Sequence, residues 1–200
     1  MLGSITPLGE RGRGSRWWLT VSAYVVGSSV GGLAMGAVAG LLGAVTVGAL
    51  EVSTPARLVA LALALLFGIA LDLRIGGLKV PTIHRQVDEE WRARYRGWVW
   101  GLGFGLQLGT GVVTIVTTST VFATWLAAAL TGSAGGGAAV GLVFGLARAL
   151  PVFSVAGVRR PDQLLRVDGV LTRLAGPARR ATYAAGGALA AVSLAEATRW

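Results

Sequence analysis

WWLTVSAYVVGSSVGGLAMGAVAGLLGAVTVGAL, residues 17–50, is the stretch that decides the fold, and it contains no charged residue. A helix needs about 20 mainly apolar residues to cross a bilayer. This segment is therefore long enough for one tilted or broken span, or for a tight pair of helices. Arginines precede it, as in a signal peptide, but the apolar part of a cleavable signal has only about 7 to 15 residues. We expect the segment to be retained as the first span.

The composition of the whole chain also indicates a membrane protein. Of the 200 residues, 54% are hydrophobic and 14% are charged, and the mean hydropathy is +0.66. A water-soluble domain carries about 25% charged residues, so this chain has too little polar surface to meet water on all sides. The net charge is +9, but the basic residues lie between apolar runs. That arrangement predicts the lipid bilayer and its anionic headgroups as partners, and no nucleic acid.

Four further apolar segments follow the first one: 57–73, 98–130, 137–155 and 181–195. The arginines and lysines gather before residue 17, in 74–97 and in 157–180. Cytoplasmic loops collect such residues, and all three stretches fall on one side if each apolar segment crosses once. We therefore predict an all-α, polytopic membrane helix bundle of about five transmembrane helices, with six as the alternative. We expect it in the plasma membrane with a cytoplasmic N-terminus.

Two of the basic stretches also carry apolar residues at helical spacing: Val87, Trp91, Tyr95 and Trp98 in the first, and Leu164, Val167, Leu171 and Leu174 in the second. Such stripes predict helices that lie in the headgroup layer on the cytoplasmic side. The alternative is a solvated helix packed on protein. The chain then divides into a basic tail (1–16), a first membrane repeat (17–97), a second membrane repeat (98–180) and a last span (181–200).

Glycine recurs at every fourth position in three of the apolar segments. Spacing by four places these residues on one helix face, where another backbone can approach closely. We predict that they pack helices together; the alternative is that they permit sliding or local unwinding beside a substrate path. They are Gly32, Gly36, Gly40, Gly101, Gly105, Gly109, Gly137, Gly141 and Gly145.

A polar stripe in the third segment is the best candidate for a substrate path. A row of hydroxyls and an amide at membrane depth can coordinate an ion or line a wet cavity, although threonine often bonds to the carbonyl one turn back. Two charged residues within the apolar segments extend the candidate path, either as a pair or as side chains that snorkel to the interface. The candidates are Gln107, Thr110, Thr114, Thr117, Thr118, Arg148 and Asp72.

The sequence gives little support for catalysis or for metal binding. The chain has no cysteine and one histidine, His84. The acidic residues that follow His84 pair with arginines at i,i+4 spacing, which accounts for them without catalysis. Because no catalytic or nucleotide-binding motif is present, we expect no enzyme activity, no catalytic residues, no metal and no cofactor.

The stretch GLGFGLQLGTGVVTIVTTSTVFATWLAAALTGSAGGGAAVGLVFGLARALPV, residues 101–152, resembles the second half of the cytochrome c-biogenesis and thiol-disulfide interchange transmembrane family, within the lysine-exporter-like group. The resemblance implies six spans arranged as inverted three-helix halves, and electron transfer through a Pro-Cys motif in each half. Here Gly109, Thr110 and Gly111 stand in the corresponding neighbourhood. The resemblance therefore indicates a divergent, cysteine-less member without a thiol relay.

Two functions remain open at this point. The first is a transporter- or exporter-like permease for a small solute or ion, with the polar stripe as its path. The second is a non-catalytic scaffold or accessory subunit of an electron-transfer or cofactor-assembly complex. In that case the glycine faces receive a membrane protein partner or a second copy of the chain.

Overall fold

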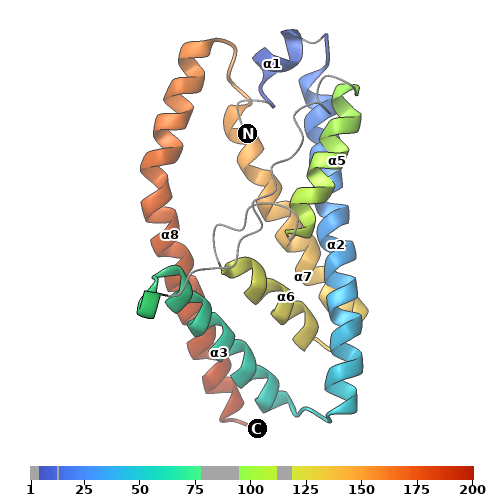
Figure 1. Ribbon diagram of the computed structural model, residues 1–200, viewed down its shortest axis with the longest axis vertical. Coiled ribbons are helices and arrows are strands. Elements are labelled where there is room, and N and C mark those ends of the chain that lie inside the picture. The colour runs from blue at the N-terminus through green and yellow to red at the C-terminus, as the bar shows by residue number, and fades with distance from the viewer. Residues whose placement is uncertain (1–4, 13, 78–94, 112–118) are drawn as a thin grey trace.

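The computed structural model describes residues 5–12, 14–77, 95–111 and 119–200, and these residues contain helices and no strand. Figure 1 shows an elongated bundle with α2, α5 and α7 on one side, α3 and α8 on the other, and α6 between them. The elements are α1 (Pro7–Gly12), α2 (Trp17–Ala49), α3 (Thr54–Asp72), the 3-10 turn η2 (Ile75–Gly77), α5 (Gly97–Thr110), α6 (Thr120–Leu130), α7 (Ala134–Ala149), the 3-10 turn η3 (Leu150–Val155) and α8 (Pro161–Ala197).

The predicted all-helical membrane bundle is confirmed. Within the described residues, three stretches are long and apolar enough to cross a membrane: Trp17–Ala49, Thr54–Asp72 and Ala134–Val155. The first is one unbroken helix rather than a hairpin, and its 33 residues reach about 50 Å at 1.5 Å per residue. It contacts α5, α6 and α7. Its other face exposes apolar side chains such as Leu42 (63% exposed) and Val45 (69%), as lipid contact requires.

The third apolar segment is broken. α5 ends at Thr110 because Gly111 adopts a left-handed conformation with φ of 68°, which an L side chain rarely tolerates. The next described helix, α6, begins at Thr120. With 14 and 11 residues, α5 and α6 are each shorter than a complete span.

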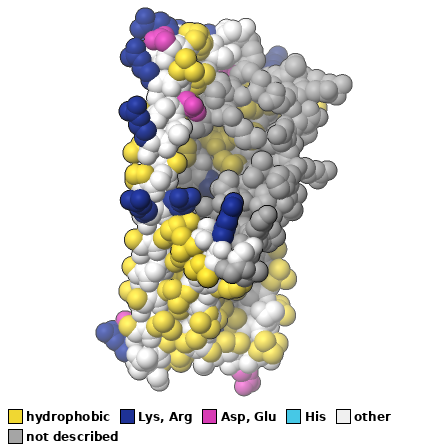
Figure 2. Space-filling view, turned by 60° about the vertical axis from the view of Figure 1, so that its left-hand side comes forward, with side chains coloured by type: hydrophobic (Ala, Val, Ile, Leu, Met, Phe, Trp, Pro, Cys, Tyr) yellow, Lys and Arg dark blue, Asp and Glu magenta, His cyan; other side chains and the backbone are white. Residues whose placement is uncertain are grey.

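α8 joins two features that the sequence suggested as separate helices. The apolar stripe 164–174 and the last apolar segment 181–195 are halves of one 37-residue helix, which continues through Pro177. Proline removes a helix hydrogen bond, but alanine, leucine and arginine around it are strong helix formers. Figure 2 shows arginines along the upper half of this side of the molecule and hydrophobic side chains over its lower half. Most of the other predicted interfacial helix, 87–98, lies outside the described residues.

The segment before α2 packs against the N-terminal end of that helix. The Trp17 indole Nε1 donates a hydrogen bond to the carbonyl oxygen of Ile5 at 2.9 Å. The Thr20 hydroxyl donates to Oε2 of Glu10 at 2.8 Å, and Glu10 is fully buried. Ile5 and Trp17 also belong to a buried apolar cluster with Trp100. α1 is thereby fixed against the start of α2.

Candidate functional site

The contact between α2 and α7 is made by glycines on both helices. A Cβ atom added at Gly36 would collide with the carbonyl oxygen of Gly137, and one added at Gly32 would collide with that of Gly141. One turn further along, the Ser28 hydroxyl donates to the carbonyl oxygen of Gly145 at 2.7 Å across the two helices. Backbones in such close contact leave no space for a solute between these helix faces.

The contact between α2 and α5 has the same character. A Cβ atom at Gly101 would lie 2.6 Å from the carbonyl oxygen of Thr20, and Cβ atoms at Gly105 and Gly109 would collide with the carbonyl oxygens of Tyr24 and Ser28. We call the contacts of α2 with α5 and α7 the glycine core. Across this core, helix backbones meet without intervening side chains.

Asp72 anchors the start of α6. The Ser119 backbone N–H donates to one oxygen of the Asp72 carboxylate at 2.8 Å, and the Ser119 hydroxyl donates to the other at 3.0 Å. Gly68 permits this approach, since a Cβ atom there would lie 2.7 Å from the Ser119 hydroxyl oxygen. A carboxylate stabilises a helix N-terminus because it satisfies free N–H groups and complements the helix dipole. The end of α3 and the beginning of α6 are thereby joined.

A cavity of about 390 Å³, which we call the side cavity, opens beside this anchor between α3, α6 and α8. It is partly open to the outside, and most of its lining is apolar. The Thr124 hydroxyl donates a hydrogen bond to the carbonyl oxygen of Thr120 at 2.8 Å. The Thr182 hydroxyl donates to the carbonyl oxygen of Ala178 at 3.0 Å. The polar residues of the lining are Asp72, Ser119, Thr120, Thr124, Thr182 and Tyr183.

Arg148 lies in the last turn of α7, where a basic side chain complements the helix dipole. Its guanidinium carbon is 5.4 Å from the centre of the Phe144 ring. That ring also meets Trp125 edge-to-face, with 4.9 Å between the centroids. Arg148 is therefore set among aromatic side chains of the bundle and is not among the residues that line the side cavity.

The structure separates the predicted substrate-path residues. Asp72 lines the side cavity, whereas Gln107 and Thr110 are on α5, where the Thr110 hydroxyl donates to the Gln107 carbonyl oxygen at 2.9 Å. The remaining candidates, Thr114, Thr117 and Thr118, lie outside the described residues.

Sequence reasoning missed the contribution of α8 to this site. Thr182, Gly186 and Leu189 line the side cavity, and their spacing of three and four residues places them on one helix face. That spacing is visible in the sequence, but it does not show which other helix the face meets.

These features define a polytopic helical membrane protein with an interrupted third apolar segment and a cavity beside the interruption. Among protein-family models, the cytochrome C biogenesis protein transmembrane region matches residues 2–178. The chain therefore belongs to this family, as its sequence indicated, and the match extends well beyond residues 101–152. It stops at Ala178, so Thr182, Gly186 and the rest of the α8 wall of the side cavity lie outside it. No curated protein and no solved structure matches the chain.

Proposed function

We propose that the chain is a non-catalytic accessory subunit of a membrane assembly of the cytochrome c biogenesis type, and that the side cavity receives a transmembrane partner. One observation carries this proposal: the chain belongs to that family and has no cysteine. It therefore supplies no thiol for electron relay, and any thiol chemistry in the assembly belongs to another component.

The packing of the bundle supports an accessory role. The glycine core brings backbones into contact, which makes it a rigid support rather than a path. The side cavity, in contrast, is apolar, partly open and bordered by small residues, including Ala127, Ala185 and Gly186. An apolar side chain or a helix face of a membrane partner fits such a surface.

The absence of native cysteine allows a direct test. Single-cysteine variants Thr124→Cys and Ala185→Cys place a thiol at the side cavity, and Val38→Cys is the control on the far side of α2, where Val38 is 51% exposed. Each thiol is coupled to a benzophenone in native membranes and illuminated. We expect both cavity positions to give one shared adduct, which the control does not give. Its mass identifies either another membrane protein or a second copy of the chain.

A small-solute permease is the second candidate, and the polar edge of the side cavity favours it. Asp72, Ser119 and Thr120 lie together at this edge, beside a break in a membrane segment. Broken helices carry substrate sites in several transporter folds. In the same variants, labelling of Thr124→Cys and Ala185→Cys by a hydrophilic, membrane-impermeant thiol reagent, without any adduct, would replace the accessory role with transport.

A further inference from the structure

A second cavity lies at the other end of the described bundle, away from the side cavity. It has a volume of about 730 Å³ and is formed by α1, the first turns of α2 and the chain just before α8. Three arginines from these three segments line it: Arg11, Arg16 and Arg159. We call it the arginine groove. Its remaining lining is Pro7, Ser15, Trp17, Trp18, Leu19, Ser22 and Ala156.

The positive charge of the groove is not neutralised within the described part of the chain. The groove lining contains no acidic side chain, and no ion pair joins its arginines to a described acidic residue. The nearest acidic residue along the chain, Glu10, is fully buried and accepts a hydrogen bond from Thr20. Three exposed guanidinium groups therefore share one cavity, and no described acidic side chain lines it.

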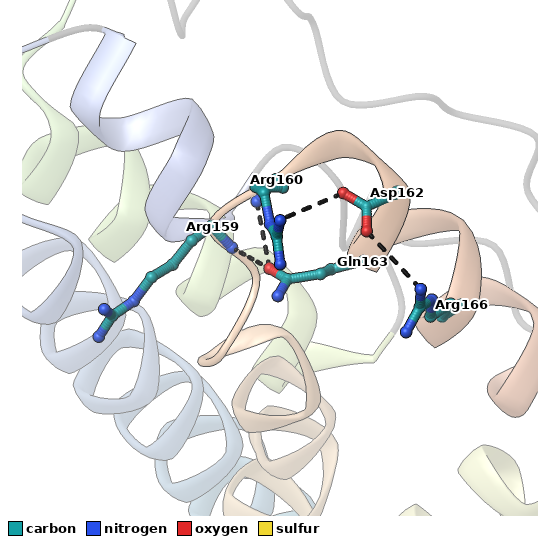
Figure 3. Close-up of polar contacts among 5 residues, drawn as sticks. All are labelled: Arg159, Arg160, Asp162, Gln163 and Arg166. Atoms are coloured by element: carbon teal, nitrogen blue, oxygen red, sulfur yellow. Dashed lines mark hydrogen bonds and ion pairs between the residues drawn. The ribbon is translucent and has the colours of Figure 1, made fainter.

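The neighbouring arginines at the start of α8 differ in this respect. Asp162 lies 4.0 Å from Arg160 and 3.9 Å from Arg166, and Gln163 Oε1 accepts the backbone N–H of Arg159 at 2.7 Å. Figure 3 shows the Arg159 side chain extending away from this cluster. Asp162 thus offsets part of the charge of its two arginine neighbours, whereas Arg159 lines the groove.

The beginning of α2 adds to the positive potential. This 33-residue helix has no acidic residue in its first turn, and its N-cap residue, Arg16, provides no side-chain cap. The free N–H groups and the dipole at a helix N-terminus attract anions. Here the helix start and three guanidinium groups border the same space.

The groove continues into an apolar surface. Trp18 is 64% exposed and Leu19 54% exposed, and tryptophan favours the interface between headgroups and hydrocarbon. Below Trp18, Ser22 and then Val26 (54% exposed) and Val30 (50%) follow at intervals of four, so they form one stripe along α2. An anion bound in the groove would have an apolar surface directly beneath it.

We propose that the arginine groove binds the phosphate of an anionic phospholipid, whose acyl chain lies along the Trp18 stripe of α2. Guanidinium groups hold phosphate with paired, charge-assisted hydrogen bonds, and the apolar stripe distinguishes a lipid from a soluble phosphate. The site is independent of the proposed accessory role, because it involves neither the side cavity nor a protein partner.

The test is a lipid titration of the purified, delipidated full chain in detergent, followed by native mass spectrometry. Wild-type protein is expected to bind one phosphatidylglycerol in preference to phosphatidylcholine. Each arginine near an anionic lipid contributes a factor of about five in affinity, so the triple variant Arg11→Gln, Arg16→Gln, Arg159→Gln should lose about a hundredfold. The matched control Arg173→Gln, Arg179→Gln, Arg180→Gln removes the same charge from α8 and should retain the preference.

Other outcomes would overturn the proposal. An equal loss in both triple variants would mean unspecific charge attraction. Competition by inorganic phosphate at the affinity of the lipid would mean a soluble-anion site. Should the glutamine variant fail to fold, the lysine variant Arg11→Lys, Arg16→Lys, Arg159→Lys keeps the charge and loses the paired hydrogen bonds. It must then bind phosphatidylglycerol more weakly than wild type but still prefer it to phosphatidylcholine, and an unchanged affinity would contradict the site.

Discussion

The two sides of the bundle are packed in opposite ways. In the glycine core, α2 meets α5 and α7 through backbone atoms, with Gly36 against Gly137 as the central contact. Around the side cavity, α3 meets α6 and α8 through side chains, and about 390 Å³ remains between the three helices. A backbone contact tolerates no added atom, whereas a contact between side chains can be repacked. The comparison therefore predicts a rigid support on one side and an adaptable surface on the other.

The largest expected effect tests the rigid side. Gly36→Ile places a branched side chain against the backbone of Gly137, where even a Cβ atom collides. Overpacking costs about 1 to 3 kcal/mol when side chains can adjust. Because the backbone of Gly137 cannot adjust in this way, we expect the free energy of unfolding to fall by about 3 kcal/mol or more. The measurement is thermal unfolding of the purified protein in detergent.

Gly48→Ala is the matched control for this prediction. Gly48 is in the same helix, but a Cβ atom there meets nothing within 4 Å. Alanine favours a helix over glycine by about 1 kcal/mol, so the control should melt at the wild-type temperature or above it. A Gly36→Ile variant with the melting temperature of wild type would refute the rigid core.

The next effect tests the link between the two sides. Asp72→Ala removes both acceptors of the Ser119 hydrogen bonds and leaves the start of α6 uncapped. Hydrogen bonds to a charged group contribute about 1.5 to 3 kcal/mol. Because Asp72 is only partly buried, we expect the free energy of unfolding to fall by about 2 kcal/mol. Thermal unfolding measures it.

Two further variants serve as controls for the Asp72→Ala prediction. Asp72→Asn keeps one acceptor oxygen and should lose less than Asp72→Ala. Asp168→Ala removes an exposed carboxylate of α8 and should change the stability by less than about 0.5 kcal/mol. Equal losses in Asp72→Ala and Asp168→Ala would show that the anchor contributes nothing to the stability of the fold.

The same comparison explains how far the sequence predicted the structure. Glycine spacing is a local property of one helix, so it marks a face whether or not the partner helix is known. The side cavity depends on α8 meeting α3 far away along the chain, which no local spacing records. The polar stripe was predicted from helical spacing between Gln107 and Thr118, but the left-handed Gly111 ends α5 at Thr110. Periodicity does not carry across such a break.

The smallest expected effect on stability concerns the side cavity. It compares leucine substitutions at two adjacent glycines of α8, Gly186 and Gly187. A Cβ atom at Gly186 would lie 3.3 Å from the tip of Ile69 in the side cavity, whereas one at Gly187 meets nothing within 4 Å. Gly186→Leu should fill part of the cavity. Both leucine variants should unfold within about 1 kcal/mol of wild type, because leucine favours a helix over glycine and the cavity has room.

The two variants should differ in function rather than in stability. If the side cavity receives a partner, Gly186→Leu occupies the space of that partner, and the benzophenone adduct formed from Thr124→Cys should fall severalfold. Gly187→Leu adds the same volume and the same helix preference outside the cavity, so it should leave the adduct unchanged. Equal adduct yields in the two backgrounds would place the partner elsewhere on the bundle. The adaptable side would then be a loosely packed contact between helices and not a binding surface.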